Sequence, residues 1–250
     1  MSWAEPRALR AQIQTAVELL YPPRCLGCGE MVDSDFGLCG VCWRDTPFIG
    51  GVVCESCGVP LPGAADGYRI ECDDCMAMPR PWSEGRAALL YKDRARRLVL
   101  ALKHGDRPEI AKPAALWMAR AARPILEDSL LIAPVPLHWM RFVKRRYNQS
   151  ALLAQQLAKV TGLGHCPDLL LRRKRTPMLD GKSVTERAVA LDGVIIAHPR
   201  RQSLIEGRGI LLIDDVMTSG ATLAACSDAC LAAGAAEVRV LVLARVAKET

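Results

Sequence analysis

One segment near the C-terminal end constrains the fold more than any other part of the chain. It begins with four apolar residues, Ile210–Ile213, which are typical of a buried strand in a parallel sheet. Two carboxylates, Asp214 and Asp215, follow and are expected to end the strand. A short loop of hydroxyl residues and glycine comes next, before a helix-like stretch at Leu223–Ala233. This order of strand, tight loop and helix predicts an α/β fold with a ligand site at the loop.

The loop before the predicted helix has the composition of an anion site. Backbone N–H groups at a helix N-terminus favour negative charge, and Gly220 lets the backbone approach a phosphate closely. The acidic pair suits a different partner, because carboxylates repel phosphate but accept hydrogen bonds from hydroxyl groups. A ligand with both vicinal hydroxyls and a phosphate is a ribose 5-phosphate. An ordinary turn with capping hydroxyls is the alternative interpretation. The candidate binding residues are Asp214, Asp215, Thr218, Ser219, Gly220, Ala221 and Thr222.

This segment resembles the signature of the type I phosphoribosyltransferases. The resemblance implies that Asp214 and Asp215 hold the ribose hydroxyls of phosphoribosyl pyrophosphate, and that residues 218–222 hold its 5-phosphate. The same two residues are the catalytic candidates, because a carboxylate can stabilise the positive character left on the ribose when pyrophosphate departs. Mg²⁺ is expected to arrive with the ligand, since it binds through substrate phosphates and few protein groups. Arg141 and Arg145, in the loop after the preceding predicted strand, are expected near the pyrophosphate.

Four Cys-x-x-Cys pairs occupy the N-terminal third of the chain. The two-residue gap lets both thiolates of a pair point at one ion, and two pairs complete a tetrahedral zinc site. The segment has few apolar residues, so metal binding would have to supply its folding energy. The pattern therefore predicts a double zinc ribbon with two structural Zn²⁺ ions. The predicted ligands are Cys25, Cys28, Cys39, Cys42, Cys54, Cys57, Cys72 and Cys75.

The spacing leaves the pairing of the cysteines open. Sequential pairing, with the first four on one ion and the last four on the other, is the arrangement we favour. An interleaved arrangement would use the same cysteines. A disulfide framework is the alternative to metal, but it requires an oxidising compartment. No signal-peptide core or apolar run of roughly 20 residues is present, so we expect a cytoplasmic protein without a transmembrane segment.

The pattern divides the chain into three parts: an N-terminal helix (residues 1–24), the double zinc ribbon (25–80) and a phosphoribosyltransferase-like domain (81–250). Pro79-Arg80-Pro81 has the composition of an extended linker between the last two. Strands and helices alternate after it, which predicts a parallel sheet with helices on both faces. The expected strands are 86–91, 130–135, 169–171, 210–213 and 238–246, and the expected helices are 93–104, 110–126, 150–161 and 223–233.

The chain as a whole resembles the competence protein F (ComF) family, which joins a double zinc ribbon to a phosphoribosyltransferase-like domain. The resemblance covers most of the chain and implies a role in natural transformation, in the handling of incoming single-stranded DNA. Two departures from the family pattern, Leu179 and Ala190, remove polar side chains from the loop that covers the active site. The blocks that carry the resemblance are Tyr21–Gly29, Ala133–His138, Arg146–Gln149, Leu152–Ala154 and the acidic-pair loop.

Two hypotheses of different classes follow. In the first, the protein is an active phosphoribosyltransferase of nucleotide salvage, whose accepting base the sequence does not indicate. In the second, which we favour, it binds phosphoribosyl pyrophosphate or a related ribose phosphate and also single-stranded DNA. From Arg141 to Arg175 there are nine Lys or Arg residues and one acid, which could follow a strand backbone. Tyr147 or Trp139 could stack on a base, and the zinc ribbon could dock a protein partner.

Overall fold

The computed structural model describes residues 22–33, 37–64, 67–104, 107–137, 147–173 and 193–247. It divides into two units, Met1–Thr46 and Pro47–Thr250. Each unit contains one of the two groups of cysteines. Almost all of the N-terminal helix expected over residues 1–24 lies outside the described residues. Among those that are described, no helix is both long and apolar enough to cross a bilayer.

The first unit is built around its cysteines. Arg24 and Met31 form an isolated antiparallel bridge, and the turn between them contains the first Cys-x-x-Cys pair. The second pair lies at the start of a five-residue helix, α2 (Gly40–Arg44). The N-cap of this helix is Cys39, whose sulfur accepts a hydrogen bond from the backbone N–H of Cys42.

The second unit contains a five-stranded sheet in the order β1-β7-β6-β2-β3, and all four neighbouring pairs are parallel. This confirms the predicted parallel α/β architecture. Parallel pairing places the carboxyl ends of β2 and β6 side by side, and the N–H of Val135 donates to the carbonyl of Ile213 over 2.9 Å. The strands are β1 (Glu84–Leu90), β2 (Leu131–Pro134), β3 (Gly164–His165), β6 (Gly209–Met217) and β7 (Glu237–Arg245).

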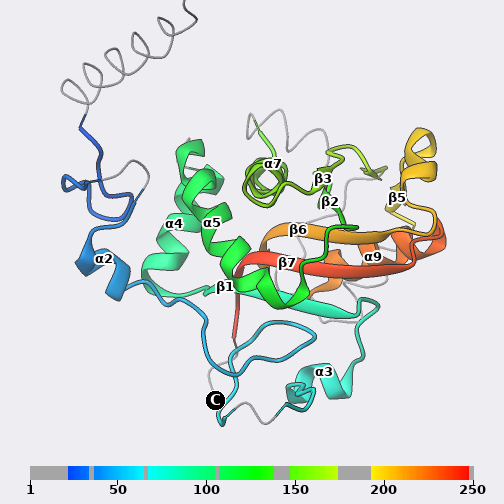
Figure 1. Ribbon diagram of the computed structural model, residues 1–250, viewed down its shortest axis with the longest axis horizontal. Coiled ribbons are helices and arrows are strands. Elements are labelled where there is room, and N and C mark those ends of the chain that lie inside the picture. Colours follow the sequence, from blue (N-terminus) through cyan, green and yellow to red (C-terminus); the bar gives the residue numbers. More distant parts are fainter. Residues whose placement is uncertain are drawn as a thin grey trace, which may run out of the picture. The chain divides into compact units, whose positions relative to one another are not determined.

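Helices cover both faces of this sheet. Side chains on a strand alternate between faces, and Ile210 and Leu212 belong to the same buried cluster as Leu223 and Cys226 of the last helix. The other face receives the three preceding long helices, which Figure 1 shows together on one side of the sheet. The helices are α4 (Asp93–His104), α5 (Ala111–Ala122), α7 (Gln149–Thr161) and α9 (Ala221–Ala232).

Two sequence-based expectations about strands differ from the structure by more than a few residues at an end. The acidic pair does not end its strand, because β6 continues through Asp214 and Asp215 to Met217 while β7 pairs with it throughout. The strand expected at 169–171 is β4 (Leu170–Arg172), which is not part of the main sheet and pairs antiparallel with β5 (Ile195–Ala197) in a separate two-stranded sheet. The short helix α3 (Asp73–Ala77), near the end of the segment expected to form the ribbon, lies in the same unit as the sheet.

Candidate functional site

The eight predicted metal ligands form two separate groups in the sequential arrangement. Within each group the four sulfur atoms lie within 4.8 Å of one another. The sulfurs of Cys28 and Cys39 are 3.7 Å apart, as are those of Cys57 and Cys72. Four sulfurs bound to one zinc ion at about 2.3 Å would be about 3.8 Å apart. Both groups are therefore consistent with structural zinc sites.

Backbone N–H groups point at the cysteine sulfurs in both groups. In the first group, the N–H of Cys39 donates to the sulfur of Cys25 over 3.2 Å. In the second, the N–H of Cys72 donates to the sulfur of Cys54 over 3.3 Å. A hydrogen bond from the Cys57 thiol, reinforced by these backbone donors, lowers the pKa of Cys54 to about 4. Such donors stabilise thiolate, which is the form that binds zinc.

The second cluster is built directly onto the edge strand β1. The N–H of Gly85 donates to the carbonyl of Glu55 over 2.8 Å, and the indole N–H of Trp82 donates to the carbonyl of Ser56 over 2.6 Å. A Cβ on Gly58 would lie 2.6 Å from the backbone nitrogen of Ala87. The turn between Cys54 and Cys57 thus packs on the strand at a distance that only glycine allows.

The acidic pair lies at the carboxyl end of β6, and its two carboxylates have different partners. Asp214 accepts a hydrogen bond of 2.8 Å from the hydroxyl of Ser150, at the start of α7. Asp215 forms an ion pair of 3.1 Å with Lys103, in the last turn of α4. The sequence analysis missed both partners, because only the tertiary fold brings α4 and α7 to this edge.

Two neighbouring carboxylates in a largely enclosed position disfavour each other's charge. Removal from water, followed by the charge of Asp215, raises the pKa of Asp214 to about 7. The Ser150 hydroxyl and the positive charge of Lys103 oppose this rise, since both favour the ionised form. Asp214 is therefore poised to change its charge near neutral pH.

Residues 147–149 anchor this edge of the sheet. Asn148 caps α7 by accepting from the N–H of Ser150, and its amide donates to the carbonyl of Val135. The hydroxyl of Tyr147 donates to the carbonyl of Leu102 over 2.7 Å, and the amide of Gln149 donates to that of Lys103. These bonds hold the N-terminus of α7 between β2 and the end of α4, which explains how Ser150 reaches Asp214.

The loop after β6 lies at the N-terminus of α9, as the sequence predicted. Gly220 adopts a left-handed conformation with φ of 82°, and its carbonyl accepts the first helical hydrogen bond, from the N–H of Ala224. Two arginines hold the loop carbonyls: Arg245 donates to Thr218 over 2.7 Å, and Arg80 donates to Ser219 over 2.8 Å. Neither arginine was a sequence-based candidate, although an arginine at the end of an otherwise buried strand is itself a signal.

Several candidates lie outside the described residues, so the structure brings them neither toward nor away from the acidic pair. They are Arg141, Arg145, Trp139, Lys144, Arg146, Lys174, Arg175, Leu179 and Ala190.

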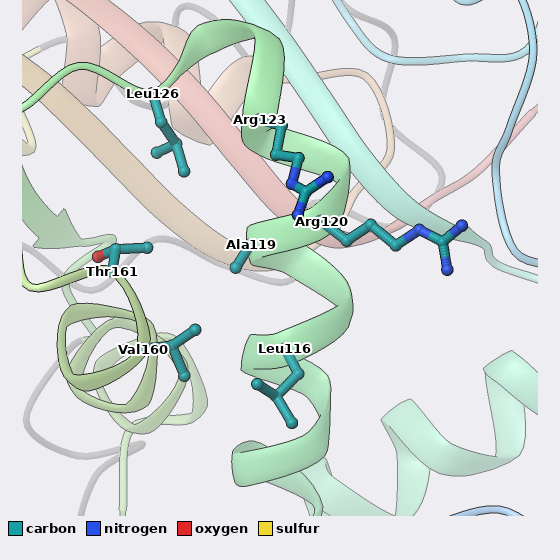
Figure 2. Close-up of a pocket in the computed structure, with 7 residues that line it drawn as sticks. All are labelled: Leu116, Ala119, Arg120, Arg123, Leu126, Val160 and Thr161. Atoms are coloured by element: carbon teal, nitrogen blue, oxygen red, sulfur yellow. The ribbon is translucent and has the colours of Figure 1, made fainter.

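The structure also has a hollow of about 520 Å³ between α5 and α7. Figure 2 shows Leu116 and Ala119 facing Val160 and Thr161 across the gap, while Arg120 extends away from it. Because α7 starts beside Asp214 and ends at Thr161, this hollow lies at the other end of the helix and is separate from the acidic pair.

Comparison with known proteins agrees with this arrangement. Residues 16–76 match the double zinc ribbon domain, and residues 118–250 match the phosphoribosyl transferase domain. The DNA utilization protein YhgH of Escherichia coli (strain K12) is 31% identical over 225 residues, which are 84% of this chain and 91% of that protein. Competence protein F of Haemophilus influenzae is 27% identical over 89% of this chain and 96% of that protein. The chain belongs to the ComF family.

More distant matches to this ComF chain also exist. Competence protein ComFC of Bacillus subtilis is 25% identical over 77% of each chain. A solved structure titled as the allosteric regulatory enzyme of purine biosynthesis aligns with 58% of this chain, at 18% identity and a TM-score of 0.39. This chain covers only 30% of that longer one, and the likeness is too distant to bear on the chemistry.

Proposed function

We propose that this ComF protein binds phosphoribosyl pyrophosphate, or a related ribose phosphate, together with Mg²⁺ at the carboxyl edge of its sheet. We further propose that it binds single-stranded DNA and acts in DNA uptake. The observation that carries the first proposal is the position of the acidic pair directly before a glycine-containing loop at a helix N-terminus. In that arrangement, carboxylate oxygens that can accept hydrogen bonds from ribose hydroxyls lie next to backbone N–H groups that can donate to a phosphate.

The geometry at the acidic pair supports this role. The hydrogen bonds recorded for Asp214 in the described part of the chain go to Oδ1, and the ion pair of Asp215 uses Oδ2. One oxygen of each carboxylate is thus the natural acceptor for a ribose hydroxyl. Lys103, already paired with Asp215, would add positive charge close to a polyanionic ligand. Arg141 and Arg145 remain our candidates for the pyrophosphate.

The DNA part of the proposal rests on charge and on the relatives. The names of those relatives refer to DNA utilization and competence. In this chain, Arg172 is the last residue of β4, and Arg173 follows it in the basic run that continues to Arg175. Guanidinium groups in series are suited to successive phosphates of a flexible strand.

The experiment that tests the ribose-phosphate site is a thermal shift with phosphoribosyl pyrophosphate and Mg²⁺. A ligand that binds only the folded state at a hundred times its dissociation constant stabilises it by about 2.7 kcal/mol. Asp214→Asn combined with Asp215→Asn should abolish the shift, because an amide cannot replace both acceptor oxygens. Asp228→Asn, an exposed change on α9, is the matched control and should retain it. Wild-type protein without a shift at millimolar ligand would contradict the proposal.

A second measurement separates binding from catalysis. Release of pyrophosphate from phosphoribosyl pyrophosphate is followed in the presence of a panel of purine and pyrimidine bases. A binding protein gives a thermal shift without base-dependent release, which is the result we expect. Base-dependent release that is lost in the Asp214→Asn variant would instead establish the alternative, an active phosphoribosyltransferase.

A further inference from the structure

Three successive carbonyl groups, at the end of β6 and in the loop after it, accept hydrogen bonds from arginines. Arg245 donates from Nη1 to the carbonyls of Met217 at 3.3 Å and Thr218 at 2.7 Å. Arg80 donates from Nη1 to the next carbonyl, that of Ser219, at 2.8 Å. Each of these carbonyls therefore has a guanidinium partner.

This arrangement determines where the loop amides point. In a trans peptide the C=O and N–H of one unit point in opposite directions. Fixing the carbonyls of Thr218 and Ser219 on arginines therefore turns the N–H groups of Ser219 and Gly220 to the opposite side. The positive guanidinium also polarises each peptide unit, which makes its N–H a stronger donor to an anion. The arginines thus prearrange two phosphate donors without touching the phosphate.

Arg80 also reaches the second cysteine cluster. Its Nε donates to the sulfur of Cys75 at 3.5 Å, and its guanidinium carbon lies 5.7 Å from the ring centre of Trp82. Trp82 in turn bonds the carbonyl of Ser56, between two cysteines of the cluster. Its ring would lie 3.1 Å from a Cβ on Gly220. A single side chain therefore connects a candidate metal ligand to the loop at the ligand site.

We propose that Arg80 is a positioning residue for the phosphate loop, held in place by the second cysteine cluster. In this arrangement the metal-loaded cluster fixes one end of the guanidinium, and the other end sets the orientation of the peptide between Ser219 and Gly220. The inference rests on the proposed ribose-phosphate site, but the mechanical connection exists in the ligand-free protein. At the first cluster the nearby arginine, Arg24, donates instead to the carbonyl of Gly29 within its own turn, which makes it a matched comparison for Arg80.

The decisive test compares Arg80→Gln with Arg24→Gln in the full chain. Each change removes an arginine that donates to a loop carbonyl near one cluster. Metal content and exchange protection of β6 and β7 are measured first, to show that both variants are folded and loaded. Amide hydrogen exchange of residues 218–222 is then measured without ligand. We expect about tenfold faster exchange there in Arg80→Gln and no change in Arg24→Gln. Unchanged exchange in Arg80→Gln would overturn the inference.

Affinity for phosphoribosyl pyrophosphate with Mg²⁺ provides the functional measurement. Arg80→Gln should bind about tenfold more weakly, whereas Arg24→Gln should bind like wild type. Arg80→Lys keeps the charge, but its ammonium group cannot bridge two acceptors as the guanidinium fork does. It should therefore also bind more weakly than wild type. If Arg80→Gln loses its metal, the affinity of Arg80→Lys tests the inference in its place. Equal affinity of Arg80→Lys and wild type would overturn the inference. Failure of wild type to bind would instead contradict the proposed function, while loop exchange would still test the connection.

Discussion

The two cysteine clusters of this chain share a ligand pattern but have different surroundings. Each uses four cysteines in two Cys-x-x-Cys pairs, and each has glycine directly after one pair. In the described part of its unit, the hydrogen bonds around the first cluster are local, such as that from Arg24 to the carbonyl of Gly29. The second cluster shares a buried core with Trp82, Met217 and Leu223 of the second unit. The same motif therefore lies in a separate small unit in the first cluster and in the core of the sheet domain in the second.

The difference shows that a Cys-x-x-Cys motif predicts which residues can bind a metal ion, but not which residues pack around the metal site. The spacing of the cysteines determines which sulfurs can meet around one ion. The consequences of losing that ion depend on what the intervening turns contact, and those contacts come from residues elsewhere in the sequence. The turn at Ser56 contacts Trp82 and Gly85 of the sheet domain. Loss of the metal from the second cluster is therefore expected to disturb the proposed ligand site as well.

The strongest test of this contrast removes one buried ligand from each cluster. Cys42 and Cys75 are each the fourth cysteine of their group, and both are about 1% exposed. Cys75→Ser should destabilise the sheet domain by more than about 4 kcal/mol, because structural zinc contributes on the order of 10 kcal/mol to folding. Cys42→Ser should leave the sheet domain unchanged. Hydrogen exchange of β6 and β7 in increasing denaturant measures both effects.

Metal analysis is the control for that experiment. We expect two equivalents of zinc in the wild-type chain and one in each variant. One equivalent or less in freshly reduced wild type would contradict the two-site prediction. Equal destabilisation of the sheet by both variants would contradict the contrast between the clusters.

Glycines after the first pair of each cluster allow a smaller test. Gly29 and Gly58 both have positive φ, at 81° and 70°, but only Gly58 faces backbone atoms closer than 3 Å. Gly29→Ala should cost about 1 kcal/mol of unfolding free energy in its own unit, for the left-handed conformation alone. Gly58→Ala should cost roughly 2–4 kcal/mol, because the new methyl group also forces the turn away from Ala87. Equal losses of unfolding free energy, measured by denaturant unfolding, would show that the turn at Gly58 is no more tightly packed than the turn at Gly29.

Much of the sheet domain could be predicted from the sequence, because local pattern and tertiary structure agree there. The helix expected at 93–104 is α4 with the same bounds, and the acidic pair does lie beside a loop and a helix N-terminus. What the pattern could not give is the set of partners that meet only in the fold. Lys103, Ser150 and Arg80 come from three segments that lie far apart in the sequence, and no sequence pattern connects their positions.

The errors have physical causes as well. Asp214 and Asp215 looked like the end of a strand because carboxylates are rarely buried. The ladder with β7 and the partners Lys103 and Ser150 compensate for that burial, so the strand continues. Pro79-Arg80-Pro81 was interpreted as a linker from its prolines, and that pattern gave no indication of the bonds from Arg80 to Cys75 and Ser219.

Affinity at the proposed ligand site, which lies beside the second cluster, should depend on pH through Asp214, whereas changes in the first cluster should not affect that dependence. The pKa of Asp214 is about 7, well above that of an unfolded aspartate, and only the carboxylate is a pure acceptor for ribose hydroxyls. Affinity for phosphoribosyl pyrophosphate should therefore rise with pH through about 7 and level off above it. Ser150→Ala removes a donor that favours the ionised form, so the midpoint should move up by about one pH unit.

Two comparisons make the titration specific. Ionisation of the ligand's own phosphates affects wild type and Ser150→Ala alike, so the difference between their midpoints reports on Asp214. Cys42→Ser, which alters only the first cluster, should keep the wild-type midpoint. A midpoint that does not move in Ser150→Ala would contradict the assigned role of Asp214.

The smallest expected effect concerns DNA and compares arginines from the two units. Each phosphate contact on a single strand contributes about 0.7 to the slope of log affinity against log salt. Arg172→Ala with Arg173→Ala should therefore flatten the slope by about 1.4, which is about a sevenfold change in relative affinity over a fourfold range of salt. The matched pair Arg24→Ala and Arg44→Ala, both exposed in the first unit, should leave the slope unchanged. Fluorescence anisotropy with labelled oligonucleotides measures both. A larger change from the first-unit pair would make the first cluster's unit the DNA-binding part, and it would reverse the contrast in which ligand binding belongs to the sheet domain.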